Sequence, residues 1–433
     1  MSYFAPRFLF ATVLALPLVA QDEPQKPAKA PTVAAASGPM LVVKTTTEDV
    51  AMGASMMFAS EEGAGEMPQL PKLEAGQHWV ISVGTDKKVA ISTGKGDVGY
   101  LSATVKPGLM MSAFEEQIGE TMQMMQGMAT MGLQQAGIKA ADAVKMIKAV
   151  LDFPKQVDSL DLKVVGDPEK ASSEGMDIDL SLQPVKDTWF ARFAAAMQPN
   201  QAGAPMVEGD APIRVAAALD TKGMSAFYDV YADFAAGIGA KKPEDKAKAA
   251  EMIRKSSQLM DGTFGMTMTL GTGMRILMGV SDGAAMAQLV GSDEYLAFQK
   301  AATSANPMME VEMTPKALEH RGVAVTKVST KFKDESMAAM GGPMAMTGDM
   351  FTGVAGNYVF SIMGGEQDAK GVIDSALDSK VKRAPLPGGA LMTVKANLKE
   401  MAGAMGGDEE VPENLEISLT RKGDGLNLKI RAK

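Results

Sequence analysis

One serine lies in the setting that a catalytic nucleophile needs. Residues 279–283 (GVSDG) match the pattern G-x-S-x-G and fall between a predicted strand and a predicted helix, as a nucleophile elbow does. A serine hydrolase also needs a histidine, and the only one that follows is His320, beside a predicted hairpin turn. Related strand-to-helix turns elsewhere in the chain lack the serine. We therefore expect Ser281 or Asp282 to cap the helix that follows, and we keep a serine hydrolase at Ser281 as the second alternative function.

A glycine pattern typical of nucleotide sites occurs once. Residues 94–99 (GKGDVG) match G-x-G-x-x-G, which binds a dinucleotide when it leads from a strand into a helix. The helix is needed because its N-terminus receives the pyrophosphate. Here the motif leads into residues 100–105 (YLSATV), which predict another strand. We expect a hairpin loop and no nucleotide cofactor.

The usual metal-site residues are scarce. The chain has no cysteine and two histidines, His78 and His320, whereas a zinc site needs three or four nitrogen, sulfur or oxygen ligands. The pair Asp177 and Asp179 alternates with apolar residues, which is typical of the polar face of a strand and not of a calcium loop. The sequence thus predicts no cofactor and no zinc or calcium site.

Methionine is unusually frequent, with 37 residues. One predicted helix, Leu109–Gln135, carries a stripe at helical spacing that comprises Met111, Phe114, Ile118, Met122, Met125 and Leu133. Met124, Met128 and Met131 lie beside this stripe and widen the apolar surface. We expect most methionines to fill the core, and we take these three as candidates for contact with an apolar ligand or a protein. Thioethers also bind Cu(I), so the same three are the candidate ligands of the alternative function, a Cu(I)-binding protein.

The N-terminal residues resemble an export signal. Arg7 precedes the apolar run 8–19, which is too short to span a bilayer, so residues 1–20 predict a signal peptide. Residues 21–38 are rich in proline and alanine and predict a disordered tether. We expect an exported protein, periplasmic or extracellular, whose mature chain begins near Gln21.

Net charge and hydropathy limit the classes of partner that we expect this chain to bind. The formal charge is −9, so the chain lacks the basic balance that phosphate backbones attract, and we expect no nucleic-acid partner. No stretch after the leader reaches 18 apolar residues, so we expect no transmembrane segment once the signal is removed.

Periodicity predicts an α+β fold. Helical spacing marks Leu109–Gln135, Gly223–Ile238 and a helix that opens at Pro243 and is closed by Gly262. A Gly/Met-rich stretch, Ser336–Gly353, predicts a long loop. Runs of alternating residues predict strands at Leu160–Val165, Met176–Leu182, Phe264–Leu270, Met308–Met313, Val323–Phe332, Leu415–Leu419 and Leu426–Ile430.

Weak internal similarity suggests a duplication. Residues 103–114 resemble residues 217–227, sharing the string MSAF, and residues 392–401 repeat the outline more loosely. Each copy reads as a strand followed directly by a helix. We expect two related domains, 39–197 and 212–433, joined by a linker at 198–211. Each is a curved antiparallel sheet covered on one face by Met-rich helices.

These observations favour a binding protein over an enzyme. We expect an exported, non-enzymatic envelope or extracellular protein that binds an apolar small molecule, a lipid or a protein partner. A Met-based Cu(I)-binding protein and a serine hydrolase are the two alternatives.

Overall fold

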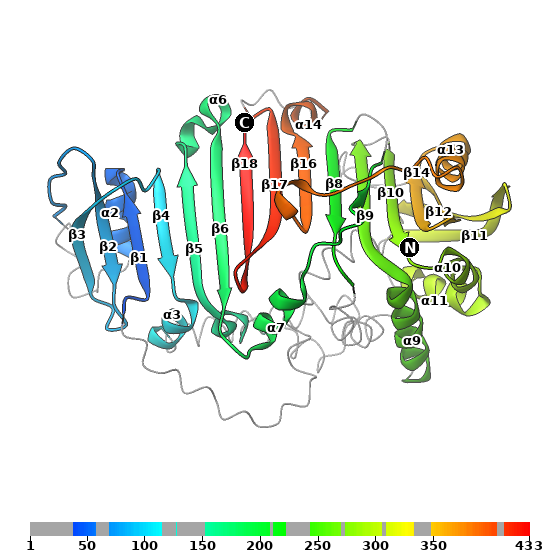
Figure 1. The fold of residues 1–433 in the computed structure, drawn as a ribbon, viewed down its shortest axis with the longest axis horizontal. Helices are drawn as coiled ribbons and strands as arrows, with labels where there is room; N and C mark the ends of the chain where they lie inside the picture. The colour runs from blue at the N-terminus through cyan, green and yellow to red at the C-terminus, as the bar shows by residue number, and fades with distance from the viewer. Residues whose placement is uncertain are drawn as a thin grey trace.

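The computed structural model describes residues 38–57, 69–114, 127, 152–207, 211–221, 243–269, 273–304, 309–332, 348–404 and 411–433. Their centre is one sheet of 16 strands, in which every pair of neighbours runs antiparallel (Figure 1). From one edge to the other the strands are β11 (Met309–His320), β12 (Val323–Phe332), β13 (Gly348–Ala355), β14 (Tyr358–Met363), β10 (Gly273–Val280), β9 (Met260–Thr269), β8 (Ile213–Ala218), β16 (Met392–Asn397), β17 (Asn414–Lys422), β18 (Gly425–Ala432), β6 (Met176–Pro184), β5 (Val157–Val165), β4 (Leu101–Val105), β1 (Leu41–Thr45), β2 (Gln77–Val83) and β3 (Val89–Lys95).

The alternation in the sequence gives this sheet two different faces. In β6, Asp177 and Asp179 lie on one face, and Ile178 and Leu180 on the other, because successive side chains of a strand point to opposite sides. Asp177 and Asp179 are each paired with a basic residue of β18. The α+β prediction and the largely antiparallel sheet are thus confirmed, and the two faces are called the polar face and the apolar face below.

The strand-then-helix order that the sequence similarity predicted is present at β4 with α3 (Pro107–Ala113) and at β16 with α14 (Leu398–Ala404), and the helix predicted after β8, Gly223–Ile238, lies outside the described residues. Three segments of the sheet also share a pairing pattern. In each, a first strand pairs with the first strand of a later hairpin, and the segments are β4–β5–β6, β8–β9–β10 and β16–β17–β18. Equivalent strands of different segments also pair, β6 with β18 and β8 with β16. Antiparallel pairing of equivalent strands relates neighbouring segments by a local twofold axis. Strands from both sides of the predicted linker 198–211 therefore belong to one continuous sheet, and the division into two domains stays a prediction.

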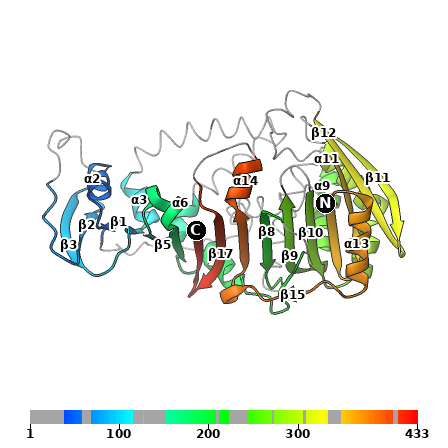
Figure 2. The ribbon, with the colours of Figure 1, turned by 90° about the horizontal axis from the view of Figure 1, so that it is seen from above.

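Helices cover both ends of the sheet. The α-helices are α2 (Glu48–Met57), α3 (Pro107–Ala113), α6 (Ala171–Glu174), α7 (Trp189–Ala196), α9 (Pro243–Leu259), α10 (Gly283–Val290), α11 (Asp293–Ser304), α13 (Glu366–Leu377) and α14 (Leu398–Ala404). On the apolar face, α2 and α3 pack over β1 and β2, while Met286 of α10 packs over β10 and β14. The polar face carries α13, whose Ile373 packs against Phe360 and Leu277. Figure 2 shows α13 on the opposite side of the sheet from α2 and α11.

A short two-stranded ribbon, β7 (Ala204–Pro205) with β15 (Arg383–Ala384), lies near β9 and β14. Arg383 anchors it, because its guanidinium pairs with Asp261 of β9 at 2.8 Å and donates to the Tyr358 hydroxyl of β14 at 2.9 Å. The ribbon includes part of the predicted linker, whose residues 203–205 are buried.

Three sequence expectations are corrected. Helix α9 ends at Leu259, and Gly262 lies inside β9 and does not close the helix. The last six residues of the predicted loop 336–353 belong to β13, where Met350 is buried. Residues 96–100 are not a hairpin loop, because they connect β3 to β4, and β4 pairs with β1 and β5 instead. In all three places a long-range contact overrides the local signal.

Candidate functional site

The apolar face is continuous across the sheet. Residues directly opposite one another on neighbouring strands share a face, so the register defines rows of side chains. One row comprises Met278, Phe264, Ala217, Met392, Leu419, Leu428, Leu180, Leu162, Ala103, Val43 and Ile81. The row beside it comprises Ile276, Met266, Val215, Val394, Ile417, Ile430, Ile178, Val164 and Leu101. Neither row contains a charged side chain.

Burial along these rows is uneven. At the ends Ile81 and Ile276 are fully buried, because the end helices pack on them. In the middle the aliphatic residues are only partly buried, and they include Leu162, Ile178, Leu180, Ile417, Leu428 and Ile430. Helix α7 packs on this face near one end of the same strands through Phe190 and Phe193, which contact Leu426 and Leu182. The middle of the apolar face is therefore a hydrophobic surface that the described helices leave partly accessible.

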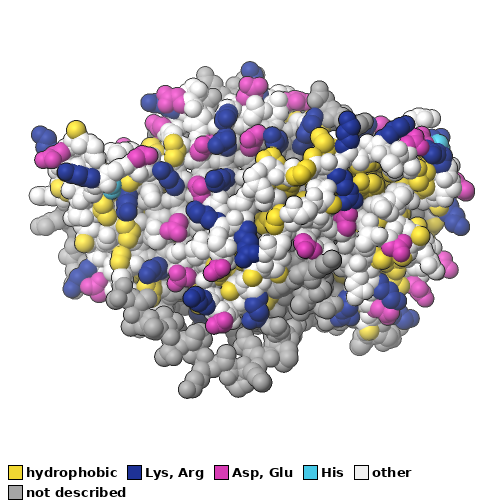
Figure 3. Space-filling view, viewed as in Figure 1, with side chains coloured by type: hydrophobic (Ala, Val, Ile, Leu, Met, Phe, Trp, Pro, Cys, Tyr) yellow, Lys and Arg dark blue, Asp and Glu magenta, His cyan; other side chains and the backbone are white. Residues whose placement is uncertain are grey.

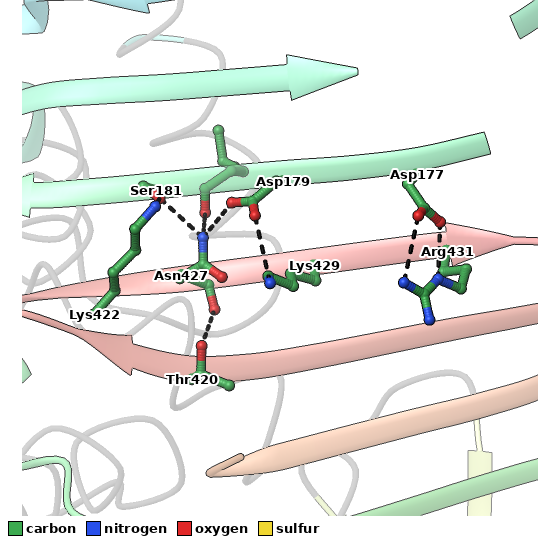
Figure 4. A network of polar contacts seen from close by, with 9 residues as sticks. Asp177, Asp179, Ser181, Thr420, Lys422, Asn427, Lys429 and Arg431 are labelled. Atoms are coloured by element: carbon green, nitrogen blue, oxygen red, sulfur yellow. Dashed lines mark hydrogen bonds and ion pairs between the residues drawn. The ribbon is translucent and has the colours of Figure 1, made fainter. Parts of the chain in front are cut away.

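The polar face of the same strands is held by a paired network (Figure 4). Asn427 of β18 is buried, and its amide donates to the Asp179 carboxylate and, at 2.9 Å, to the Ser181 hydroxyl. Lys422 donates to the same hydroxyl at 3.0 Å, and Arg431 pairs with Asp177 at 2.9 Å. The bonds of Asn427 and Arg431 join β6 to β18, and that of Lys422 joins β6 to the end of β17, although these strands lie about 250 residues from β6 in the sequence. The network fixes the register that aligns the apolar rows behind it.

Ser281 takes part in a helix start. Its Oγ donates to the Leu259 carbonyl at 3.1 Å, while the Asp282 carboxylate accepts from the Ala285 N–H at 2.9 Å and caps α10. The prediction of a cap at this motif is confirmed, with Asp282 as the capping residue. This geometry does not test the hypothesis of a serine hydrolase at Ser281, which stays the second alternative function.

The downstream histidine has a partner of its own. His320 ends β11, and its Nε2 lies 2.9 Å from the Asp374 carboxylate of α13. Arg321 donates to that carboxylate at 3.1 Å and to Asp378 at 2.8 Å. The hydrogen bond from Arg321, followed by that from His320, lowers the pKa of Asp374. His320 thus docks the β11–β12 turn on α13.

His78 is more buried than we expect for a residue at the start of a strand. It is 4% exposed, and its Nδ1 lies 3.2 Å from the Gly96 carbonyl. Within the described ranges, no three histidine, aspartate or glutamate side chains gather as a metal site would require. Met124, Met128 and Met131, the candidate contact and Cu(I) residues, lie outside the described residues, so both hypotheses for them remain predictions.

The cap offers a direct test. Asp282→Ala is expected to lower the free energy of unfolding by about 1 kcal/mol, because α10 loses the acceptor for the Ala285 N–H. Ser281→Ala removes a donor to a carbonyl and should cost less. Urea unfolding measures both, and a fluorophosphonate probe is expected to label neither variant nor the parent. A parent that is labelled, with labelling lost in Ser281→Ala at unchanged stability, would favour the hydrolase.

None of the helices in the described part of the chain combines the length and apolar character needed to cross a bilayer. The central strands supply the candidate site, and among them alternation in the sequence had assigned the two faces of Met176–Leu182, which lies in β6. Comparison with protein-family models, with curated proteins and with solved structures finds no match to this chain.

Proposed function

We propose that this protein is an exported, non-enzymatic binding protein that holds an apolar small molecule or lipid against the middle of its apolar face. The observation that supports it is the partly accessible rows of leucine and isoleucine on β5, β6, β18 and β17. Aliphatic surface left near water costs about 25 cal/mol per Å², so a ligand that covers it gains that free energy. Export rests on the predicted signal at residues 1–20.

The dimensions of this surface suit a lipid chain. Neighbouring strands are about 4.8 Å apart, so the six strands from β4 to β16 span about 24 Å. A single acyl chain covers about half of a 30 Å bilayer core, or about 15 Å. The rows offer no hydrogen-bonding side chain in this region, which favours an aliphatic ligand over a polar one. The Met-rich helix predicted at 109–135 overlaps α3 (Pro107–Ala113), which packs beside this face, and the rest of that prediction lies outside the described residues.

A neutral probe tests the proposal. N-phenyl-1-naphthylamine is expected to bind the full chain with a rise in fluorescence, and Leu428→Gln to weaken this binding about tenfold, because it places an amide in the centre of the aliphatic row. Lys429→Gln is the matched control, since it lies next in the strand on the polar face and is 59% exposed. It is expected to leave the affinity unchanged.

Native mass spectrometry of protein purified from its own envelope identifies the occupant. A co-purifying lipid or apolar small molecule is expected. Equal loss of probe binding in the two variants would contradict the site, and a co-purifying protein in place of a lipid would contradict the ligand class.

A further inference from the structure

A second concave feature lies at the strand ends of the polar face. A cavity of about 350 Å³ opens where β8 and β17 begin and β16 and β18 end. Its lining includes Arg214, Lys395, Glu416, Arg431 and Lys433, together with Asn397. Figure 3 shows a face on which Lys and Arg side chains are interspersed with Asp and Glu side chains. This cavity plays no part in the apolar site proposed above.

The sheet register brings its charged side chains together. Arg214 lies opposite Lys395, Lys395 opposite Glu416, and Glu416 opposite Arg431, so the four side chains form one row across β8, β16, β17 and β18. Directly opposite residues have Cβ atoms about 4.5–5.5 Å apart. The row thus presents three cations and one carboxylate to a single cavity, and Lys433 adds a further cation.

Glu416 is the one carboxylate side chain among the basic residues that line the cavity. Lys395 lies 3.0 Å from Glu416, and this hydrogen bond, with the charges of Lys395, Lys433 and Arg431, lowers the pKa of Glu416. Glu416 remains ionised at neutral pH and offsets one of the surrounding cations. Asp177 pairs with Arg431 from the neighbouring strand but does not line the cavity. A net positive cavity on a chain of charge −9 is contrary to the overall charge balance.

We propose that this cavity binds an oxyanion of the phosphate class. A phosphate group has several acceptor oxygens and suits a site in which arginine and lysine donors converge from separate strands. The volume lies at the low end for ligand pockets, which suits a phosphate with a small substituent. Glu416 competes with the ligand for Lys395, so it sets a moderate affinity.

Titration of the full chain with inorganic phosphate, followed by calorimetry at constant ionic strength, tests the site. Lys395→Gln and Arg431→Gln are each expected to weaken binding about tenfold, as the loss of one charge-assisted hydrogen bond does. Glu416→Gln is expected to tighten it, because it removes the competing charge. Lys429→Gln, two residues along β18 on the same face and outside the cavity, is the matched control and should change nothing.

The source of the phosphate is resolved by a second titration. Short-chain phosphatidic acid, kept below its micelle concentration, is compared with inorganic phosphate in the parent and in Leu428→Gln. Tighter binding of the lipid that returns to the phosphate level in Leu428→Gln identifies a lipid headgroup and joins this cavity to the apolar face. Equal affinity for both ligands identifies a free phosphate and leaves the cavity proposal intact if the apolar site fails.

Three results would overturn the proposal. They are an absence of saturable phosphate binding, displacement of phosphate by equimolar acetate or chloride, and an equal loss of affinity in Lys429→Gln. Lys395 and Arg431 are 58% and 48% exposed, so the variants are expected to fold, and their melting temperatures would test this.

Discussion

Replacing Gly283 by alanine is expected to lower the free energy of unfolding by about 3 kcal/mol, at the upper end of overpacking changes. Gly283 begins α10 and lies against the turn between β13 and β14, where an added Cβ would be 1.8 Å from the Gly356 carbonyl oxygen. The turn cannot easily yield, because its next residue, Asn357, accepts a hydrogen bond from Val280 at 2.9 Å. Either α10 or the turn must move, and both pack on the end of the sheet. Urea unfolding followed by circular dichroism measures the loss.

Gly371 provides a matched control inside a helix. It lies in α13, and an added Cβ there would meet no atom within 4 Å. Gly371→Ala is therefore expected to stabilise the protein by about 0.5–1 kcal/mol through the helix propensity of alanine. If the two substitutions changed the unfolding free energy by the same amount, the close approach of α10 to the turn would not be the cause.

The alternation of apolar and polar residues predicted several strands well, because this pattern lies within each strand and does not depend on its neighbours. Val323–Phe332 is β12 residue for residue, and Met176–Leu182 falls within β6. Alternation also assigned Asp177 and Asp179 to a polar face, which the ion pairs to β18 confirm. The two faces of β6, one strand of the candidate site, were thus predicted from the sequence.

The hairpin partners of these strands were predictable from the glycine-containing turns between them, but their partners distant in sequence were not. An alternating strand such as β6 has an apolar face that would suit many partners, so pattern alone leaves the pairing open. The pairing with β18 is supported by side chains distant in sequence, chiefly the buried Asn427, which donates to Ser181. The charged cavity was not predictable for the same reason. Arg214, Lys395, Glu416 and Arg431 become neighbours only when the four strands that carry them pair. Three of these strands, β8, β16 and β18, each carry one cation of the row, and β17 carries Glu416.

The organisation of the sheet links its stability to its two proposed sites. The polar network on β6 and β18 supports the strand register, and this register aligns the aliphatic rows. The same register places the charged side chains of neighbouring strands opposite one another at the strand ends. A one-residue slip of β18 would exchange its faces and place Lys429 and Arg431 among the leucines. Register errors are therefore excluded by charge, and both sites depend on one set of strand contacts.

Phe360→Ala is expected to lower the free energy of unfolding by about 3–5 kcal/mol. Phe360 of β14 is fully buried and packs with Leu277, Val325 and Ile373, between the sheet and α13. Its ring also lies over Gly353, the residue directly opposite on β13. Truncation removes the ring and leaves a cavity that the surrounding strands cannot fill. The midpoint of urea unfolding should fall with little change in slope.

A second substitution shows whether the ring and the glycine act as one unit. A Cβ on Gly353 would lie 2.9 Å from Cζ of Phe360, so Gly353→Ala alone is expected to be destabilising. In the Phe360→Ala background the ring is absent, and the new methyl group enters the cavity. The double variant should then be more stable than the sum of the single changes predicts, by at least about 1 kcal/mol, as for residues in direct contact. Additive changes would mean that the space above Gly353 is filled by something other than Phe360, and the packing of α13 on the polar face would have to be explained by other contacts.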